Sequence, residues 1–112
     1  MSDEFNHHQV IICEGRLWKK ISASNQRPVS GSGSWKDHWI KHNQGGHHWP
    51  ETCQVCDCQR EAEFGVLIVL ADDDKLKKEY VIPMCKGHSI DMAPHFVNLK
   101  QSAFVAPAEV DQ

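Results

Sequence analysis

Two pairs of potential metal ligands constrain this chain more than any other feature of its sequence. The first pair is Cys53-Gln54-Val55-Cys56, with Cys58 two residues further on, and the second is Cys85-Lys86-Gly87-His88. A C-x2-C turn brings two thiolates to one ion, and a second pair from elsewhere in the fold completes the tetrahedron that zinc prefers. The spacing predicts one structural zinc ion bound by Cys53, Cys56, Cys85 and His88. Cys58 competes with Cys56 for the second position.

The size of the chain makes such a metal centre useful to the fold. A chain of 112 residues with 40% hydrophobic residues buries only a modest core. Small domains of this kind often need a staple, and structural zinc contributes an apparent binding free energy of about 10–16 kcal/mol in small peptides. We therefore expect the zinc ion to hold the fold together.

Cysteine count and hydropathy indicate the compartment. The five cysteines are an odd number, and the N-terminal residues 1–8 show neither a basic region nor an apolar run typical of a signal peptide. These features predict a cytoplasmic protein in which metal ligation is favoured over disulfides. No apolar run reaches the roughly 18 residues of a membrane span. The formal charge of −3 gives no broad attraction to nucleic acid.

The chain divides into five segments by composition. Residues 1–8 are expected to be a disordered tail, 9–22 a β-hairpin with a turn at Glu14-Gly15, 23–33 a flexible linker, 34–105 the zinc-binding domain and 106–112 a second disordered tail. Cys13 has no partner at metal-ligand spacing, so we expect it to be a small buried hydrophobic residue.

Within residues 34–105 the patterns predict an α+β fold. Ser34-Trp35-Lys36-Asp37 is typical of a capping box at the start of an amphipathic helix, which Gly45-Gly46 ends. The run 64–70 is the expected central buried strand. Further elements are expected as a turn at 72–74, a strand over 79–82 stopped by Pro83, a short helix over 89–92, and short strands at 96–99 and 103–105.

The expected order is a cysteine-bearing turn (a zinc knuckle) at Cys53–Cys56, then a β-hairpin, then a short helix. This order resembles the treble-clef zinc core of the HNH endonuclease superfamily. The sequence motif that carries the second ligand pair in that family is matched by Val81-Ile82-Pro83-Met84-Cys85-Lys86-Gly87-His88. Small bacterial and phage proteins within this group also carry a helix similar to residues 34–39. The family's C-x4-C variant, followed by an alanine four residues later, would favour Cys58 with Ala62 over Cys56.

The resemblance also implies that catalysis is absent. HNH enzymes carry a general-base histidine on the first hairpin strand, a position that falls near Leu67, and a metal-binding histidine that corresponds to Ser89. Without these histidines, phosphodiester hydrolysis loses both water activation and charge stabilisation. We therefore expect no enzyme activity.

Three function classes are compatible with these patterns. The first is a non-catalytic zinc module that binds a protein partner, for which four tryptophans offer aromatic anchors. The second is weak nucleic-acid binding, weak because acidic and basic residues alternate around the cysteines. The third is thiol redox chemistry at Cys53 and Cys56, which is disfavoured because no helix follows that pair. The protein-binding module is the preferred interpretation.

Overall fold

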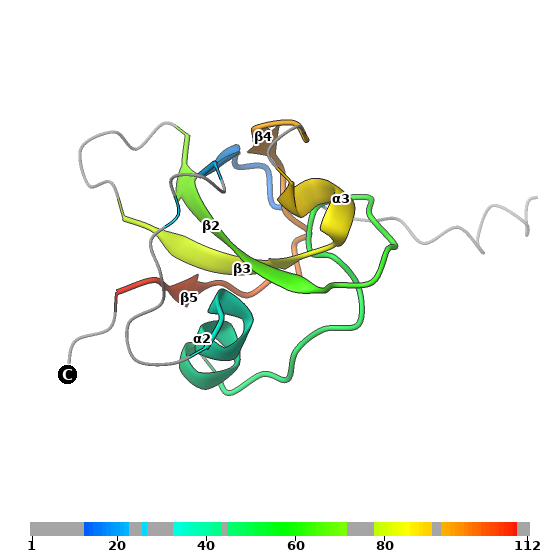
Figure 1. Cartoon of the computed structure of the whole chain (residues 1–112). Coiled ribbons are helices and arrows are strands. Elements are labelled where there is room, and N and C mark those ends of the chain that lie inside the picture. The colour runs from blue at the N-terminus through cyan, green and yellow to red at the C-terminus, as the bar shows by residue number, and fades with distance from the viewer. Residues whose placement is uncertain are drawn as a thin grey trace, which may run out of the picture.

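The most apolar run of the sequence forms the middle strand of a five-stranded antiparallel sheet. In the computed structural model the strands lie in the order β4-β1-β2-β3-β5 (Figure 1). Their bounds are β1 Trp18–Lys20, β2 Phe64–Leu70, β3 Tyr80–Met84, β4 Phe96–Val97 and β5 Ala106–Pro107. The hairpin of β2 and β3 pairs Val66 with Ile82 and Leu67 with Val81. The predicted strand over 64–70 is confirmed, and the strand predicted over 79–82 continues through Pro83 to Met84.

The structure describes residues 13–22, 26, 33–43, 45–71, 78–90 and 93–109. Several predicted segments lie outside these residues. They are the tail at 1–8, the first residues of the hairpin, nearly all of the linker at 23–33, the turn at 72–74 and residues 110–112.

Each face of the sheet is covered by a different set of elements. Successive side chains of a strand point to opposite faces, so Val66 and Ile68 lie on one face and Leu67 on the other. The first face packs against Cys53, Val55, Cys58, Cys85 and Leu99. The second face packs against Trp39 of the helix α2 (Trp35–His42). Figure 1 shows α2 on the side of the sheet opposite the short helix α3 (Lys86–Ser89).

Helix α2 begins where the sequence predicts. Ser34 Oγ accepts a hydrogen bond from the backbone N–H of Asp37 at 3.2 Å, and the Ser34 N–H donates to Asp37 Oδ2 at 3.4 Å. This reciprocal pair satisfies donors that the first turn of a helix leaves open. The helix ends at Asn43, whose side chain donates to the carbonyl oxygen atoms of Trp39 and His47, both at 2.9 Å. Capping therefore fixes both ends of α2.

Several predicted elements differ from the structure. The second strand of the predicted hairpin is β1, which pairs with β2 on one side and β4 on the other. Residues 9–12 of the predicted first strand lie outside the described part of the chain. The predicted tail at 106–112 contributes β5, with Ala106 fully buried beside Val81. The short helix begins at Lys86, earlier than predicted, because Cys85 caps its first turn, and it ends before the extended residue Ile90. Residues 91–92 of the predicted helix lie outside the described part of the chain. Residues far apart in sequence decide the first two outcomes.

A close approach between α2 and β2 depends on Gly65. A Cβ atom added at Gly65 would lie 2.5 Å from the carbonyl carbon of Trp35 and 2.6 Å from the backbone nitrogen of Lys36. Both contacts are to helix backbone, which cannot move aside as a flexible side chain would. Because Gly65 has no side chain, the first turn of α2 can rest directly on the sheet.

We expect Gly65→Ala to lower the free energy of unfolding by about 1–3 kcal/mol, the usual cost of overpacking. Chemical denaturation followed by tryptophan fluorescence measures the change. Glu63→Ala is the matched control, because Glu63 is exposed and its backbone N–H bond to Met84 is kept. Equal stability of the two variants would contradict the close packing.

Candidate metal centre

The first pair of candidate ligands, Cys53 and Cys58, lies on a loop that folds back on itself. Cys53 N–H donates to the carbonyl oxygen of Arg60 at 2.7 Å, and Cys58 N–H donates to that of Val55 at 3.1 Å. Between these bonds Asp57 adopts a φ of 72°, a left-handed conformation that aspartate tolerates better than most residues. The tight turn brings Cys53 and Cys58 to the same side of the loop.

The second pair lies where β3 runs into α3. Cys85 is the N-cap of that helix, and its Sγ accepts a hydrogen bond from the backbone N–H of His88 at 3.4 Å. Residues three apart on a helical turn lie on one face. Cys85 and His88 therefore present their side chains together toward the loop.

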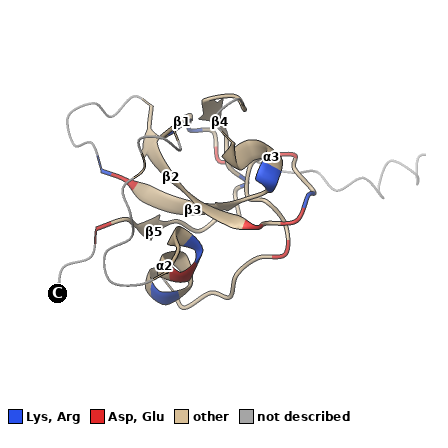
Figure 2. Ribbon diagram, in the orientation of Figure 1, with Lys and Arg blue, Asp and Glu red and all other residues tan. Residues whose placement is uncertain are grey.

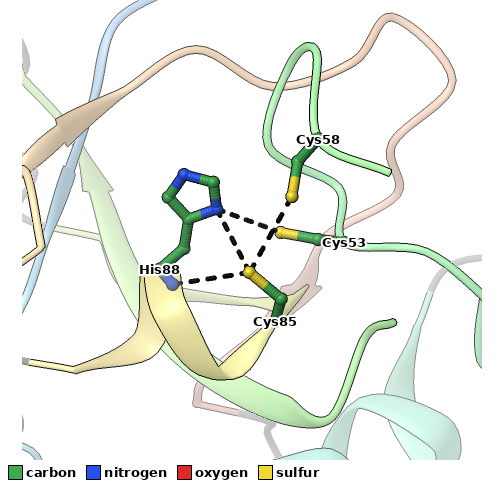
Figure 3. Close-up of side chains that lie close together, drawn as sticks. All are labelled: Cys53, Cys58, Cys85 and His88. Atoms are coloured by element: carbon green, nitrogen blue, oxygen red, sulfur yellow. Dashed lines mark hydrogen bonds between the residues drawn. The ribbon is translucent and has the colours of Figure 1, made fainter. Parts of the chain in front are cut away.

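Cys53, Cys58, Cys85 and His88 converge on one point (Figure 3). Their ligand atoms all lie within 4.8 Å of one another. Cys58 Sγ is 3.8 Å from Cys85 Sγ, and His88 Nδ1 lies 3.6 Å from Cys53 Sγ and 3.3 Å from Cys85 Sγ. The three cysteines are buried and the histidine is half-buried. This cluster could hold a metal ion.

The cluster confirms the proximity of Cys53, Cys85 and His88 but not the prediction of Cys56. The sulfur of Cys56 is bonded to that of Cys13, with the two Cα atoms 5.6 Å apart. Cys58, the competing residue, supplies the remaining sulfur. The C-x4-C spacing spans the turn at Asp57, which directs Cys56 toward Cys13 and Cys58 into the cluster. The prediction that Cys13 is a buried hydrophobic residue is also wrong, because Cys13 is exposed and disulfide-bonded.

The thiols of Cys53 and Cys85 differ in pKa because their surroundings differ. Burial raises the pKa of Cys53 to about 12, although backbone N–H groups of Val55 and Cys85 oppose the shift. Burial also raises the pKa of Cys85, but hydrogen bonds from the His88 backbone and from the Cys58 and Cys53 side chains outweigh it, so the net shift is downward. In the absence of a metal, Cys85 is thus a more acidic thiol than Cys53.

His88 is held in its neutral form. Burial lowers the pKa of its imidazole, and the positive charges of Lys20 and Arg60 lower it further. A neutral imidazole keeps a lone pair on one ring nitrogen, which is the form that binds metals. Its Nδ1 atom, which faces the sulfurs, is therefore suited to act as a ligand.

Two lysines beside the cluster escaped the sequence analysis. Lys20 donates to the carbonyl oxygen of His88, and Lys100 donates to that of Cys58 at 2.7 Å. These residues lie 68 and 42 positions from their partners. No local motif could have linked them, because only the packing of β1 and of the segment after β4 brings them to the site.

The histidines of α2 take no part in the cluster. His38 Nε2 lies 2.8 Å from the carbonyl oxygen of Pro107, and the His38 and His42 rings are 4.6 Å apart. Within the described part of the chain, the Cys/His group at Cys53 is the only set of three or more ligand atoms close enough for one metal ion. This supports a single metal centre among these residues.

The fold and the site define a small α+β protein with a buried cluster of three cysteines and one histidine. Comparison of the chain with protein-family models, curated proteins and solved structures finds no significant match. The longest helix among the described residues, α2, has eight residues, far short of the roughly 20 that cross a bilayer. None of the described helices could serve as a membrane span.

We expect Cys58→Ser to lower the bound metal from about one ion per chain to well below that value, because serine is a poor ligand where thiolate is required. The double variant Cys13→Ser, Cys56→Ser is the control and should keep its metal. Elemental analysis of the purified proteins measures the ratio. If the double variant lost its metal while Cys58→Ser kept it, Cys56 and not Cys58 would be the fourth ligand.

Proposed function

We propose that Cys53, Cys58, Cys85 and His88 bind one zinc ion and that this ion has a structural role. The distances between ligand atoms carry the proposal. Zinc–sulfur bonds of about 2.3 Å in a tetrahedron place two sulfurs about 3.8 Å apart, and a sulfur and a nitrogen about 3.6 Å apart. The sulfur–sulfur distance of 3.8 Å and the nitrogen–sulfur distances of 3.6 and 3.3 Å agree with this geometry.

The ligand set favours a structural role over a catalytic one. Structural zinc sites use four protein ligands, whereas catalytic sites use three and leave one position for water or substrate. All four positions are taken here if the whole cluster binds. The burial of the three sulfurs supports the same conclusion, because a substrate would have to displace packed core atoms.

The order of elements supports a treble-clef relationship as part of this proposal. A loop with two ligands, the β2–β3 hairpin and α3 with the second ligand pair follow one another along the chain. The two HNH-like positions are non-catalytic in our interpretation. Leu67 is fully buried beneath Trp39, and Ser89 Oγ donates to the carbonyl oxygen of Lys86 at 2.9 Å. Neither residue offers a base or a soft metal ligand.

The proposal also includes binding to a protein partner. The exposed apolar residues at the sheet edge support this part of the proposal better than the tryptophans do. Trp18 and Trp39 are each only 2% exposed, so they fill the core. At the β4–β1 edge Phe96 pairs with Lys19, and alternation along the chain puts Leu17 on the same face as Lys19. Leu17 and Phe96 are 47% and 52% exposed. Apolar side chains of this size are suited to a protein contact.

Nucleic-acid binding is the alternative, and the charge distribution gives it little support. Figure 2 shows Lys and Arg interspersed with Asp and Glu over the described chain. Binding to a phosphate backbone requires several cations on one surface, because each neutralised phosphate adds to the affinity. Along the described ribbon, basic and acidic positions are interspersed and no long basic stretch is drawn.

We expect zinc to raise the free energy of unfolding by about 2.7 kcal/mol when free zinc is 100 times its dissociation constant. Excess chelator should remove this increment. Titration calorimetry gives the dissociation constant and stoichiometry, and denaturation in zinc or chelator gives the increment. A chain that binds no zinc, or that gains no stability from it, would refute the structural role.

The second test concerns catalysis. We expect no nicking of supercoiled plasmid in magnesium, manganese or zinc beyond that of a Cys85→Ser control, because the proposed centre has no open coordination position. Gel electrophoresis of the plasmid measures nicking. His95 is the histidine that could replace the missing HNH histidines only through a rearrangement of that site. Metal-dependent cleavage by the unsubstituted chain that is lost in His95→Ala would therefore indicate a nuclease whose catalytic histidine is His95.

A further inference from the structure

Lys20 is a buried cation placed against the ligand-bearing helix. Its side chain leaves β1 on the sheet face that carries the metal cluster, and the residue is only 4% exposed. The ammonium donates to the carbonyl oxygen of His88 and, at 3.2 Å, to that of Ile90. Carbonyl oxygens at the C-terminal end of a helix lack partners within the helix. Lys20 therefore holds the end of α3 where His88 faces the cysteines.

Lys100 does the same for the other ligand-bearing segment. Its ammonium donates to the carbonyl oxygen of Cys58 at 2.7 Å and to Thr52 Oγ1 at 3.2 Å. Thr52 directly precedes Cys53. The two bonds of Lys100 therefore connect the two ends of the loop that carries Cys53 and Cys58. The backbone N–H of Lys100 also donates to the carbonyl oxygen of Gln54 at 2.9 Å. Lys100 therefore holds the loop in the conformation that brings Cys53 and Cys58 together.

The two lysines share a feature that simple loop packing does not require. Each ammonium binds the main-chain carbonyl of a residue whose side chain is a proposed ligand. Ligands held in this way lose less freedom when a metal binds, and outer-shell contacts commonly change metal affinity 10–100-fold.

The charge of the proposed centre gives these cations a second effect. Three thiolates and a neutral imidazole around a divalent ion leave one net negative charge, and burying a charge is costly unless an opposite charge lies nearby. Lys20 and Lys100 each donate a hydrogen bond to the main-chain carbonyl of a proposed ligand residue. Their charges would offset that of the metal-bound cluster.

We propose that Lys20 and Lys100 are positioning residues of the metal centre, which hold the backbone at His88 and Cys58 and offset the negative charge of a divalent metal bound by three thiolates. This inference rests on the proposed metal-binding function. It makes β1 and the segment after β4 part of the metal-binding unit. Metal binding would then be coupled to assembly of the sheet edge formed by β1 and β4.

The test compares Lys20→Met and Lys100→Met with Lys19→Met in the full chain. Lys19 is the matched control because it is on the same strand as Lys20 but is exposed on the opposite face. The zinc dissociation constant is measured by competition with a coloured chelator. Cobalt(II), loaded alone, reports the ligand set through its visible bands and the charge near the sulfurs through its thiolate charge-transfer band.

We expect Lys20→Met and Lys100→Met each to weaken zinc binding by roughly 10-fold or more, and Lys19→Met to leave it unchanged. Loss of a nearby positive charge raises the energy of the thiolate electrons, so the charge-transfer band should move to longer wavelength while the visible bands remain tetrahedral. A variant that is merely less stable would not move this band. Lys100 is only half-buried, so its variant remains informative if Lys20→Met does not fold.

Three results would overturn the inference. One is a dissociation constant in both lysine variants equal to that of Lys19→Met. Another is weakened zinc binding with an unchanged charge-transfer band, which would mean that the lysines contribute only packing and no charge effect at the sulfurs. In both cases the unsubstituted chain still binds one metal ion, so the proposed function stands. Failure of the unsubstituted chain to bind zinc or cobalt would remove the proposed function and this inference together.

Discussion

The convergence of three sulfurs and one imidazole nitrogen is the contact on which one whole face of the structure depends. Cys53 and Cys58 come from the loop before β2, and Cys85 and His88 from the end of β3 and the start of α3. Because the sulfurs also pack against Val66, Ile82 and Met84, a metal ion would join the loop and the helix to the sheet in a single step.

The two faces of the sheet are held by different kinds of interaction. On one face, apolar side chains such as Trp18 and Ile82 pack together with the three cysteines of the cluster, while Lys20 and Lys100 donate hydrogen bonds to main-chain carbonyls beside them. On the other, Trp39 packs on Leu67 and Val81, donates its indole N–H to the carbonyl oxygen of Phe104 at 2.9 Å, and meets Trp49 edge to face. The second face relies on apolar packing and on the close approach at Gly65.

One loop carries cysteines with two kinds of chemistry. Cys53 and Cys58 face the cluster, while Cys56 is bonded to Cys13, 43 residues away in sequence. A cross-link of that span restricts the unfolded chain by about 4 kcal/mol in the chain-entropy model. The disulfide ties the segment before β1 to the ligand loop, next to the bridge between Cys13 and Lys100. The loop is thereby anchored from both sides, which helps to hold the ligand geometry.

The sequence by itself determined the local features: the capping box at Ser34, the buried strand at 64–70, and the Cys and His pairs from which the proposed metal ligands come. Each rests on neighbours within a few residues, through hydrogen bonding at a helix start, alternation along a strand or the reach of a short turn. The tertiary structure decided the choice of Cys58 over Cys56, the place of β1 between β2 and β4, the burial of Ala106, and the approach of Lys20 and Lys100 to the ligands. These outcomes depend on which distant segments meet, and a one-residue change in strand register would turn Lys20 to the opposite face of the sheet.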